Sequence, residues 1–213
     1  MSETTDSKIQ NLLTQAARQN DLPAPGDSSF ASASRICETE AEAEELFERL
    51  EAKLFRIEQW DHESEISSFL LFGADGQAQP EKVAAVGDFI RITLPGSGKH
   101  DWVKIIKIHK SANETILTIQ PSPDPTDKTT DSPNSTSHFF NSDSTNNFCL
   151  QRKGEKLNFY VIGLNEKTNT DETSSVIETV RNFATSNVGS YFGIQKTQWE
   201  TFCRNFLELE KHN

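Results

Sequence analysis

The chain has 213 residues and a net charge of -11, and hydrophobic residues make up 34% of it. This length allows one large domain or two small ones with a buried core, and the acidic balance argues against binding to nucleic acid, because proteins that track phosphates collect Lys and Arg. No segment reaches the ~20 apolar residues of a membrane span, and residues 1–20 lack the apolar region of a secretory signal. We therefore expect a cytoplasmic protein that does not bind a membrane.

The N-terminal part has the pattern of a tethered helix. Apolar residues recur at helical spacing between residues 8 and 18, which predicts a short amphipathic helix. Residues 20–34 are rich in Pro, Gly, Ser and Ala, a composition typical of a linker. Residues 1–34 are therefore predicted to form a flexible N-terminal segment.

A stronger helix signal begins at Thr39, which forms a capping box with Glu42. An apolar stripe follows at intervals of three and four residues, and it consists of Ala43, Leu46, Phe47, Leu50 and Leu54. The opposite face is rich in Glu. We expect a helix that lies on the core and ends between residues 55 and 60.

From residue 65 onward the apolar period changes to that of strands. Six short strands are predicted, at residues 68–72, 88–94, 102–109, 115–120, 147–152 and 156–162. Short turns join most of them, so we expect a small antiparallel sheet or barrel, because an open sheet of this size leaves long exposed edges. A long polar loop, residues 121–147, interrupts the sheet.

Two further capping pairs predict a helical C-terminus. Ser175 with Glu178 and Thr197 with Glu200 each precede an apolar stripe, and Gly189 and Gly193 lie in the connector. The expected fold is therefore α+β: residues 35–170 form a helix and an antiparallel barrel, and residues 171–213 form a helical hairpin that packs on it.

Known catalytic and cofactor motifs are incomplete in this sequence. The loop at residues 95–100 lacks the first Gly and the final Ser or Thr of a phosphate-binding loop, and His62 with Glu63 lacks the second His of a zinc protease. Cys37, Cys149 and Cys203 are an odd number at wide spacing, which fits reduced core thiols better than disulfides or a zinc site. We expect no cofactor and no metal, and an enzyme is the less favoured class.

One group of residues is not explained by strand geometry alone and is the candidate groove for a ligand or partner. It consists of His100, Asp101, Trp102, His138, Phe139, Phe140, Asn165 and Glu166. Two adjacent Phe in a polar loop gain ~1.5–3 kcal/mol each on burial, so they either clamp the loop onto the barrel or line a groove. No catalytic residue is assigned within this group.

The segment from Val86 to Ile92 resembles the first strand of SH3-like barrels, where Gly-Asp turns the chain. Further matching motifs are Asp101–Ile105, Pro121–Pro123, His138–Phe140, Ser144–Thr145, Phe148, Gly163, Asn165–Glu166, Asn169 and Trp199. Together they are similar to an uncharacterised bacterial family between residues 60 and 207. The resemblance implies a bacterial cytoplasmic protein with a compact barrel, and it implies no activity. Leu164 stands where members of that family favour Arg.

Three hypotheses follow. The first is a non-catalytic binding or adaptor module that recognises another protein through loops and exposed edges. The second is an acidic inhibitor of a basic enzyme, because eight Glu between residues 38 and 58 face only three basic residues. The third is a hydrolase or transferase in which His100, Asp101 and His138 supply acid and base, which requires these side chains to lie within hydrogen-bond reach.

Overall fold

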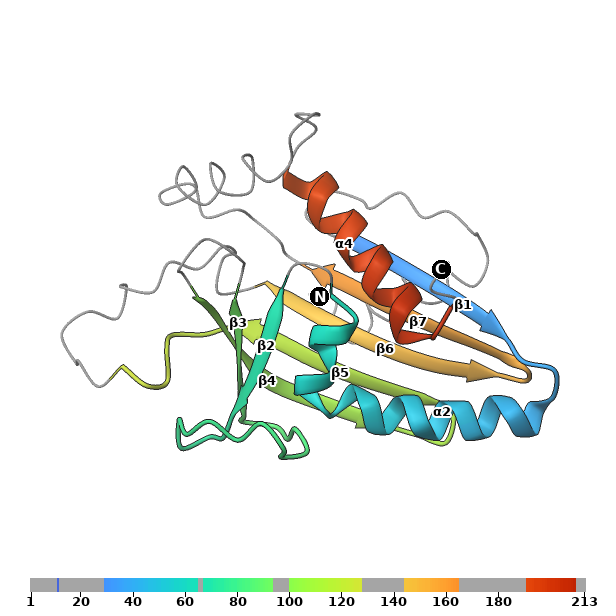
Figure 1. The fold of residues 1–213 in the computed structure, drawn as a ribbon, viewed down its shortest axis with the longest axis horizontal. Coiled ribbons are helices and arrows are strands. Elements are labelled where there is room, and N and C mark those ends of the chain that lie inside the picture. Colours follow the sequence, from blue (N-terminus) through green and yellow to red (C-terminus); the bar gives the residue numbers. More distant parts are fainter. Residues whose placement is uncertain are drawn as a thin grey trace, which may run out of the picture.

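The computed structural model describes residues 29–64, 67–93, 100–127, 144–164 and 191–209, together with Asn11. The described strands form one antiparallel sheet in the order β1-β7-β6-β5-β4-β3-β2 (Figure 1). Its seven strands are β1 (Ser29–Ile36), β2 (Ser68–Phe72), β3 (Phe89–Thr93), β4 (His100–Lys110), β5 (Glu114–Pro121), β6 (Thr145–Lys153) and β7 (Lys156–Leu164). The fold is α+β, as the sequence predicts.

Helices cover one face of this sheet. They are α2 (Glu40–Leu54), the short 3-10 helix η1 (Ile57–His62) and α4 (Tyr191–Phe206), and with the strands they enclose the larger of two hydrophobic clusters in the described residues (Figure 1). Trp60 of η1 and Phe202 of α4 are buried at its centre, where their rings meet edge-on with centroids 5.7 Å apart. Within the described ranges, no helix combines the length and the apolar character needed to cross a membrane.

Helix α2 follows its sequence signals closely. Thr39 is the N-cap, and its hydroxyl accepts a hydrogen bond of 3.2 Å from the backbone N–H of Glu42. The carboxylate of Glu42 reaches back to the N–H of Glu38 at 2.8 Å, so the reciprocal bond falls one residue before the cap. The predicted stripe is the buried face, and all five of its residues belong to the core.

The six predicted strands are confirmed with small changes in their ends, but the described strands do not close into a barrel. β1 and β2 stand at opposite edges of the sheet, and five strands separate them. The expectation of closure came from the need to protect edges and to cover an apolar face. Here α2, η1 and α4 cover that face, so no second wall of strands is needed for the core.

Strand β1 corrects the prediction of a linker at residues 20–34, since it runs across the end of that range. It pairs with β7 over its whole length, from Ser29 opposite Gly163 to Ile36 opposite Lys156. Its sequence, SFASASRI, has little intrinsic strand preference, so tertiary packing decides its structure. Ala31 is buried in the core, and its small side chain suits a strand that packs closely against α4.

Helix α4 begins six residues before the predicted cap. Gly193 and Thr197 therefore lie inside the helix and not in a connector or at a cap. The predicted apolar stripe is confirmed further along, where Phe202, Cys203 and Phe206 are fully buried. The other predicted helix of the hairpin, near residues 175–184, lies outside the described residues.

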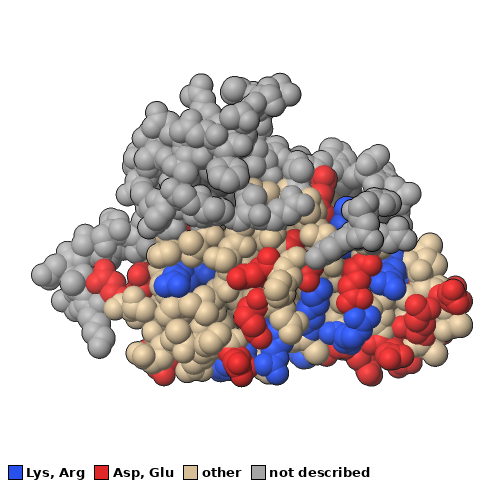
Figure 2. All heavy atoms as spheres, viewed as in Figure 1, with Lys and Arg blue, Asp and Glu red and all other residues tan. Residues whose placement is uncertain are grey.

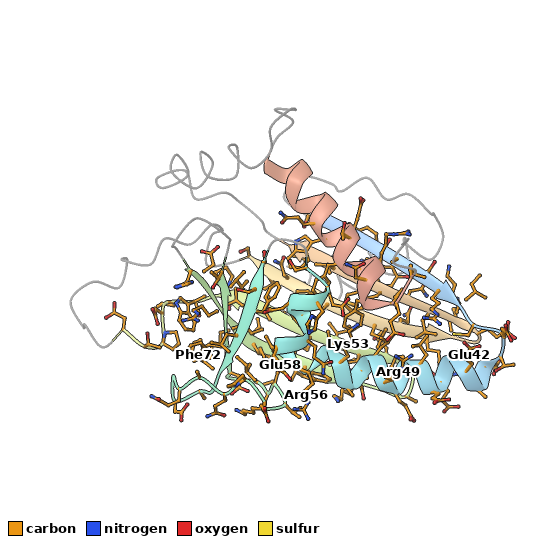
Figure 3. The ribbon with its side chains drawn as sticks, in the orientation of Figure 1. Glu42, Arg49, Lys53, Arg56, Glu58 and Phe72 are labelled. Atoms are coloured by element: carbon orange, nitrogen blue, oxygen red, sulfur yellow. The ribbon has the colours of Figure 1, made fainter. Side chains whose placement is uncertain are left out.

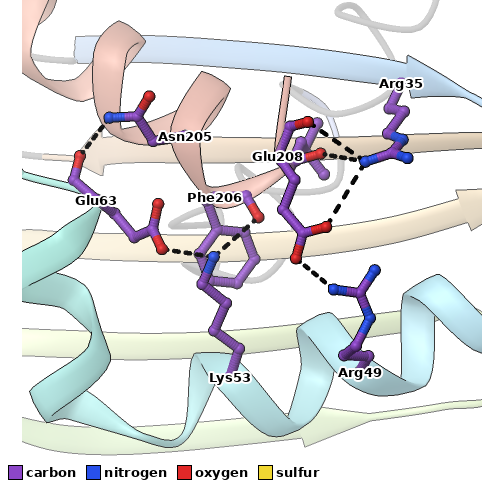
Figure 4. Close-up of polar contacts among 8 residues, drawn as sticks. Arg35, Arg49, Lys53, Glu63, Asn205, Phe206 and Glu208 are labelled. Carbon is purple, nitrogen blue, oxygen red and sulfur yellow. Dashed lines mark hydrogen bonds and ion pairs between the residues drawn. The ribbon is translucent and has the colours of Figure 1, made fainter. Parts of the chain in front are cut away.

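A polar network ties α2, η1 and the end of α4 together above the core (Figure 4). Lys53 of α2 forms an ion pair of 2.5 Å with the buried Glu63 and also donates to the backbone carbonyl of Phe206 at 3.4 Å. Glu208 pairs with Arg49 of α2 at 2.5 Å and with Arg35 of β1 at 3.7 Å. The basic residues of α2 thus hold α4 in place.

Candidate functional site

The structure places three residues of the predicted groove, and they do not converge. His100 is exposed at the start of β4, with its Nδ1 2.9 Å from the hydroxyl of Thr93. Asp101 is the next residue of the same strand, so its side chain points to the opposite face of the sheet. The pairing of His100 with Asp101 as acid and base in one site therefore lacks support.

Trp102 is buried and has the packing of an internal contact. Its ring meets Phe72 edge-on with centroids 4.7 Å apart, and the guanidinium of Arg91 lies 5.4 Å from the centre of the Phe72 ring. These residues join β2, β3 and β4 on one face. The remaining groove residues, which are His138, Phe139, Phe140, Asn165 and Glu166, lie outside the described residues.

The three cysteines offer no activated nucleophile. All are buried and unpaired, as the sequence predicts. Burial raises the pKa of the Cys149 and Cys203 thiols far above the ordinary value, and burial also raises the pKa of Cys37. In the part of the chain that the structure describes, no group of three His, Cys, Asp or Glu could hold a metal ion.

The acidic side of α2 is a solvent-exposed face. Its exposed glutamates are Glu40, Glu42, Glu44, Glu45 and Glu48. Arg49 and Lys53 turn toward α4 and η1, so they do not neutralise these glutamates. The geometry is that of a solvated helix face, and the inhibitor hypothesis stays a prediction.

A different surface combines several exposed apolar side chains. The described residues contain four exposed large hydrophobic side chains: Ile36 at 75%, Val86 at 58%, Val83 at 55% and Ile106 at 39%. Val83 and Val86 share the segment 80–88 between β2 and β3, and Ile106 lies on the adjoining strand β4. We call Val83, Val86 and Ile106 the apolar patch.

Val86 is held at the corner of a tight turn. The N–H of Asp88 donates to the carbonyl of Ala85 at 3.1 Å, and Gly87 has a positive φ of 97°. These features fit a type II turn with Val86 at the second position, since this turn requires a left-handed residue at the third. The turn presents Val86 to solvent.

The carboxylate of Asp88 fixes the rest of the segment from inside. It is 2% exposed, and it accepts hydrogen bonds from the N–H of Ala85 at 2.9 Å and from Nζ of Lys82 at 2.7 Å. Ala84 is buried, and its N–H donates to the carbonyl of Phe55 at the end of α2. Ala84, between the two valines, and Asp88, after them, therefore hold the segment against the protein.

Ile106 reaches the surface because β4 carries an extra residue there. Opposite β5, the register steps from Ile105 to Lys107, so Ile106 has no partner in the pairing of these two strands. The N–H of Gly87 donates to the carbonyl of Ile105, and the carbonyl of Asp88 accepts from the N–H of Ile105, both at 2.8 Å. Val86 and Ile106 thus flank the same pair of backbone hydrogen bonds.

The helix α2 and the segment after β2 lie near each other at Arg56. Charged side chains of both signs gather over α2 (Figures 1 and 2). Arg56, the residue before η1, lies beside the segment after β2 (Figure 3). The Nη1 of Arg56 donates to the carbonyl of Glu81 at 2.6 Å.

The sequence analysis missed the patch, although one signal was present. In β4 the alternation of apolar residues shifts phase at Ile105–Ile106, where two isoleucines are adjacent between Lys104 and Lys107. Such a shift is the expected mark of a bulge, because side chains alternate strictly along a regular strand. The exposure of Val83 and Val86 had no equivalent signal.

Fold and surface define an α+β protein with an open sheet of seven antiparallel strands, helices on one face and a fixed apolar patch at one end. No family model and no curated protein matches the chain. Its resemblance to a bacterial family with an SH3-like barrel stays a prediction.

Several solved structures are similar in shape. Hypothetical protein jhp0584 of Helicobacter pylori has a TM-score of 0.51 at 8% identity, over 87% of this chain and 89% of that one. An uncharacterised protein of Bacillus thuringiensis has a TM-score of 0.43 at 8% identity, over 85% and 99% of the two chains. TTHA0849 of Thermus thermophilus has a TM-score of 0.42 at 10% identity, over 84% and 95%. The first of these supports a shared fold and nothing further.

Proposed function

We propose that this protein is a non-catalytic module that recognises another protein through the apolar patch. The observation that carries the proposal is that three of the four exposed large hydrophobic side chains in the described residues lie on the segment 80–88 and on β4, to which this segment is hydrogen-bonded at Ile105. Single exposed apolar residues are ordinary, but a group of them commonly marks an interaction site.

The rigidity of the surface supports binding. The backbone beside Val86 is held by the buried carboxylate of Asp88 and by two hydrogen bonds to Ile105. A partner would therefore meet side chains whose backbone is already ordered, and association would cost less conformational entropy than binding to a flexible loop. Ile36 does not belong to this surface, because it lies at the end of the edge strand β1.

Affinity capture tests the proposal with a matched pair of variants. The double variant V83D/V86D removes the apolar side chains of the patch, and I36D makes the same change at an exposed isoleucine elsewhere. Burial of a valine at an interface contributes ~1.5 kcal/mol, so the double variant should bind its partner ~100-fold more weakly.

A photoreactive phenylalanine derivative in place of Val86, and in a control protein in place of Ile36, should then be applied to a lysate of the source organism. We expect one crosslinked protein at position 86 that is absent at position 36. The same protein should be captured by the wild type and I36D but not by V83D/V86D. Equal capture by all three, or equal crosslinking at both positions, contradicts the proposal.

A further inference from the structure

The two edges of the sheet are covered to different degrees in the described residues. At one edge the segment after β2 folds back on that strand, since Phe72 forms a bridge with Ala78 and the N–H of Gln79 donates to the carbonyl of Leu71 at 2.8 Å. At the other edge β1 is the last strand, and among the described strands it pairs with β7 alone (Figure 1). We call the side of β1 that faces away from β7 the outer edge.

The sequence of β1 has few of the features that keep an edge strand from pairing. The strand has eight residues, no proline and no acidic residue, and its register with β7 is continuous, so no bulge interrupts it. Its one charged residue is Arg35, whose Nη1 donates to the carbonyl of Leu207 at 3.2 Å (Figure 4). Arg35 is thus directed to the end of α4, and the outer edge is suited to accept another strand.

Side chains alternate along β1 between the two faces of the sheet. Ala31 belongs to the core beneath the helices, whereas Phe30 packs against Tyr160 on the opposite face, with ring centroids 5.7 Å apart. Ile36 lies on the same face as Phe30 and is 75% exposed. The exposed serines between them on this face are Ser32 and Ser34. The outer edge therefore has a half-buried ring near one end and an exposed aliphatic side chain at the other.

We infer that the outer edge pairs with the same edge of a second copy, so that two sheets join through antiparallel β1 strands about a two-fold axis. The partner is inferred from the order of side chains along β1. A two-fold axis between antiparallel strands is perpendicular to the sheet, so opposed residues point to the same face and the sum of their numbers is even. For a strand at 29–36, the two registers with the greatest overlap place either Ala33 or Ser32 opposite its own copy.

The side chains distinguish these two registers. With Ala33 at the centre, residues 30–36 are paired, and Ile36 lies opposite Phe30 of the second copy. Symmetry repeats this contact at the other end of the pair. With Ser32 at the centre, residues 29–35 are paired, Phe30 lies opposite a serine and Ile36 lies beyond the pairing. Aliphatic and aromatic side chains stabilise a sheet when they lie opposite each other, so the register centred on Ala33 is favoured.

This inference goes beyond the proposed function and does not depend on it. The apolar patch lies on the segment 80–88 and on β4, and three strands separate β4 from β1. A dimer that forms through β1 would therefore carry one patch on each copy. A partner with two binding segments would then bind the dimer more tightly than it binds a single chain.

Sedimentation velocity of the full chain tests the association between ~1 and ~200 µM protein. We expect the mass to rise toward twice the 23.9 kDa of one chain. I36K removes the contact with Phe30 at both ends of the pair and should weaken the dimer ~100-fold. A52K introduces the same side chain at an exposed residue of α2 and should dimerise as the wild type does.

Engineered cysteines test the register separately. The Cα atoms of opposed residues in an antiparallel pair lie ~4.5–5.5 Å apart, which is within the range of a disulfide. In the favoured register Ser32 lies opposite Ser34 of the second copy. Tagged S32C mixed with S34C should therefore form the mixed disulfide in preference to either homodimer. The wild type, whose three cysteines are buried, is the control and should form no crosslinked dimer.

Three outcomes would each overturn the inference: a chain that stays monomeric at ~200 µM, a dimer that I36K leaves unchanged, and a preference of S32C for its own disulfide. None of them decides the proposed function. That proposal is tested by V83D/V86D and by crosslinking at position 86, which do not alter the outer edge. I36D should lose the dimer, as I36K does, and still capture the partner of the apolar patch.

Discussion

Asp88 is the residue whose removal should most directly loosen the surface around the apolar patch. Its two carboxylate oxygens accept from the N–H of Ala85 and from Nζ of Lys82, and its own N–H closes the turn onto the carbonyl of Ala85. D88A removes both side-chain contacts and leaves the closing backbone bond in place. The variant should lower the free energy of unfolding and free the segment at the same time.

The magnitude follows from the two contacts. A hydrogen bond from a backbone N–H to a charged acceptor contributes ~1.5–3 kcal/mol. The ion pair with Lys82 adds at most ~1 kcal/mol, because the lysine side chain is 36% exposed. D88A should therefore lower the free energy of unfolding by ~2–4 kcal/mol. D88N keeps an oxygen that can accept from Ala85 and should cost ~1–2 kcal/mol, and K82A should cost less than ~1 kcal/mol.

Urea denaturation followed by tryptophan fluorescence measures these differences, and amide hydrogen exchange at Ala85 and Gly87 locates them. Exchange at both amides should accelerate in D88A and stay near the wild-type rate in K82A. If K82A costs as much as D88A, or if D88A unfolds within ~0.5 kcal/mol of the wild type, then the carboxylate does not organise this segment as the geometry indicates.

Three further predictions concern strain, ionisation and the polar network. G87A should lower the free energy of unfolding in urea by ~1–2 kcal/mol through the positive φ alone, because the nearest atom to a Cβ there lies at 3.9 Å. G76A should lower it further, because its Cβ would lie 2.8 Å from a backbone carbonyl oxygen. Burial raises the pKa of Tyr160 to about 12 from an ordinary 10.0. The neutral phenol therefore contributes its full stability below pH 10, and this contribution falls as the pH rises toward 12. In a pH titration, the phenolate absorbance of the folded protein should show a late step that Y160F lacks. K53M should cost ~3–5 kcal/mol by leaving Glu63 buried without its cation, and K53M/E63L should cost less in the same denaturation assay. Equal costs at the two glycines, a Tyr160 step near pH 10, or a double variant as unstable as K53M would each contradict the corresponding prediction.

The sequence predicts those elements whose signals are local. The capping box at Thr39 and the five-residue apolar stripe fix α2, because a cap and a stripe with helical period occur together only in a helix that lies on a core. The strands after residue 65 are equally clear, and the predicted bounds of β2 agree with the structure residue for residue. In these segments local preference and tertiary packing favour the same structure.

Strand β1 and the closure of the sheet depend on information that is not local. Ser and Ala carry no strong preference for a strand, and Ser29–Ile36 becomes one because β7 offers a complete edge and α4 packs above it. Closure into a barrel was inferred from the number of strands, whereas the structure uses helices from both ends of the described chain to cover the same face. Neither the pairing of β1 nor the open sheet can be predicted from the residues of a single segment.

The candidate groove shows the same limit at the level of single side chains. His100, Asp101 and Trp102 are consecutive, which made them look like one cluster in the sequence. On a strand they alternate between faces, so Asp101 is separated from both of its neighbours. The patch was missed for the opposite reason, because Val86 and Ile106 are far apart in the sequence and meet only through the hydrogen bonds at Ile105.

The valines of the patch provide a last and separate test of whether this surface exists for binding. A folded chain gains nothing from apolar side chains that stay in water, so threonine, which has nearly the same shape, should replace both Val83 and Val86 without loss of stability. V83T/V86T should unfold within ~0.5 kcal/mol of the wild type in urea and still lose most of its crosslinked partner at position 106, where the photoreactive residue replaces Ile106. If the threonines instead lower the free energy of unfolding by more than ~1 kcal/mol, the valines contribute to the packing of the segment. Their exposure would then no longer indicate a partner.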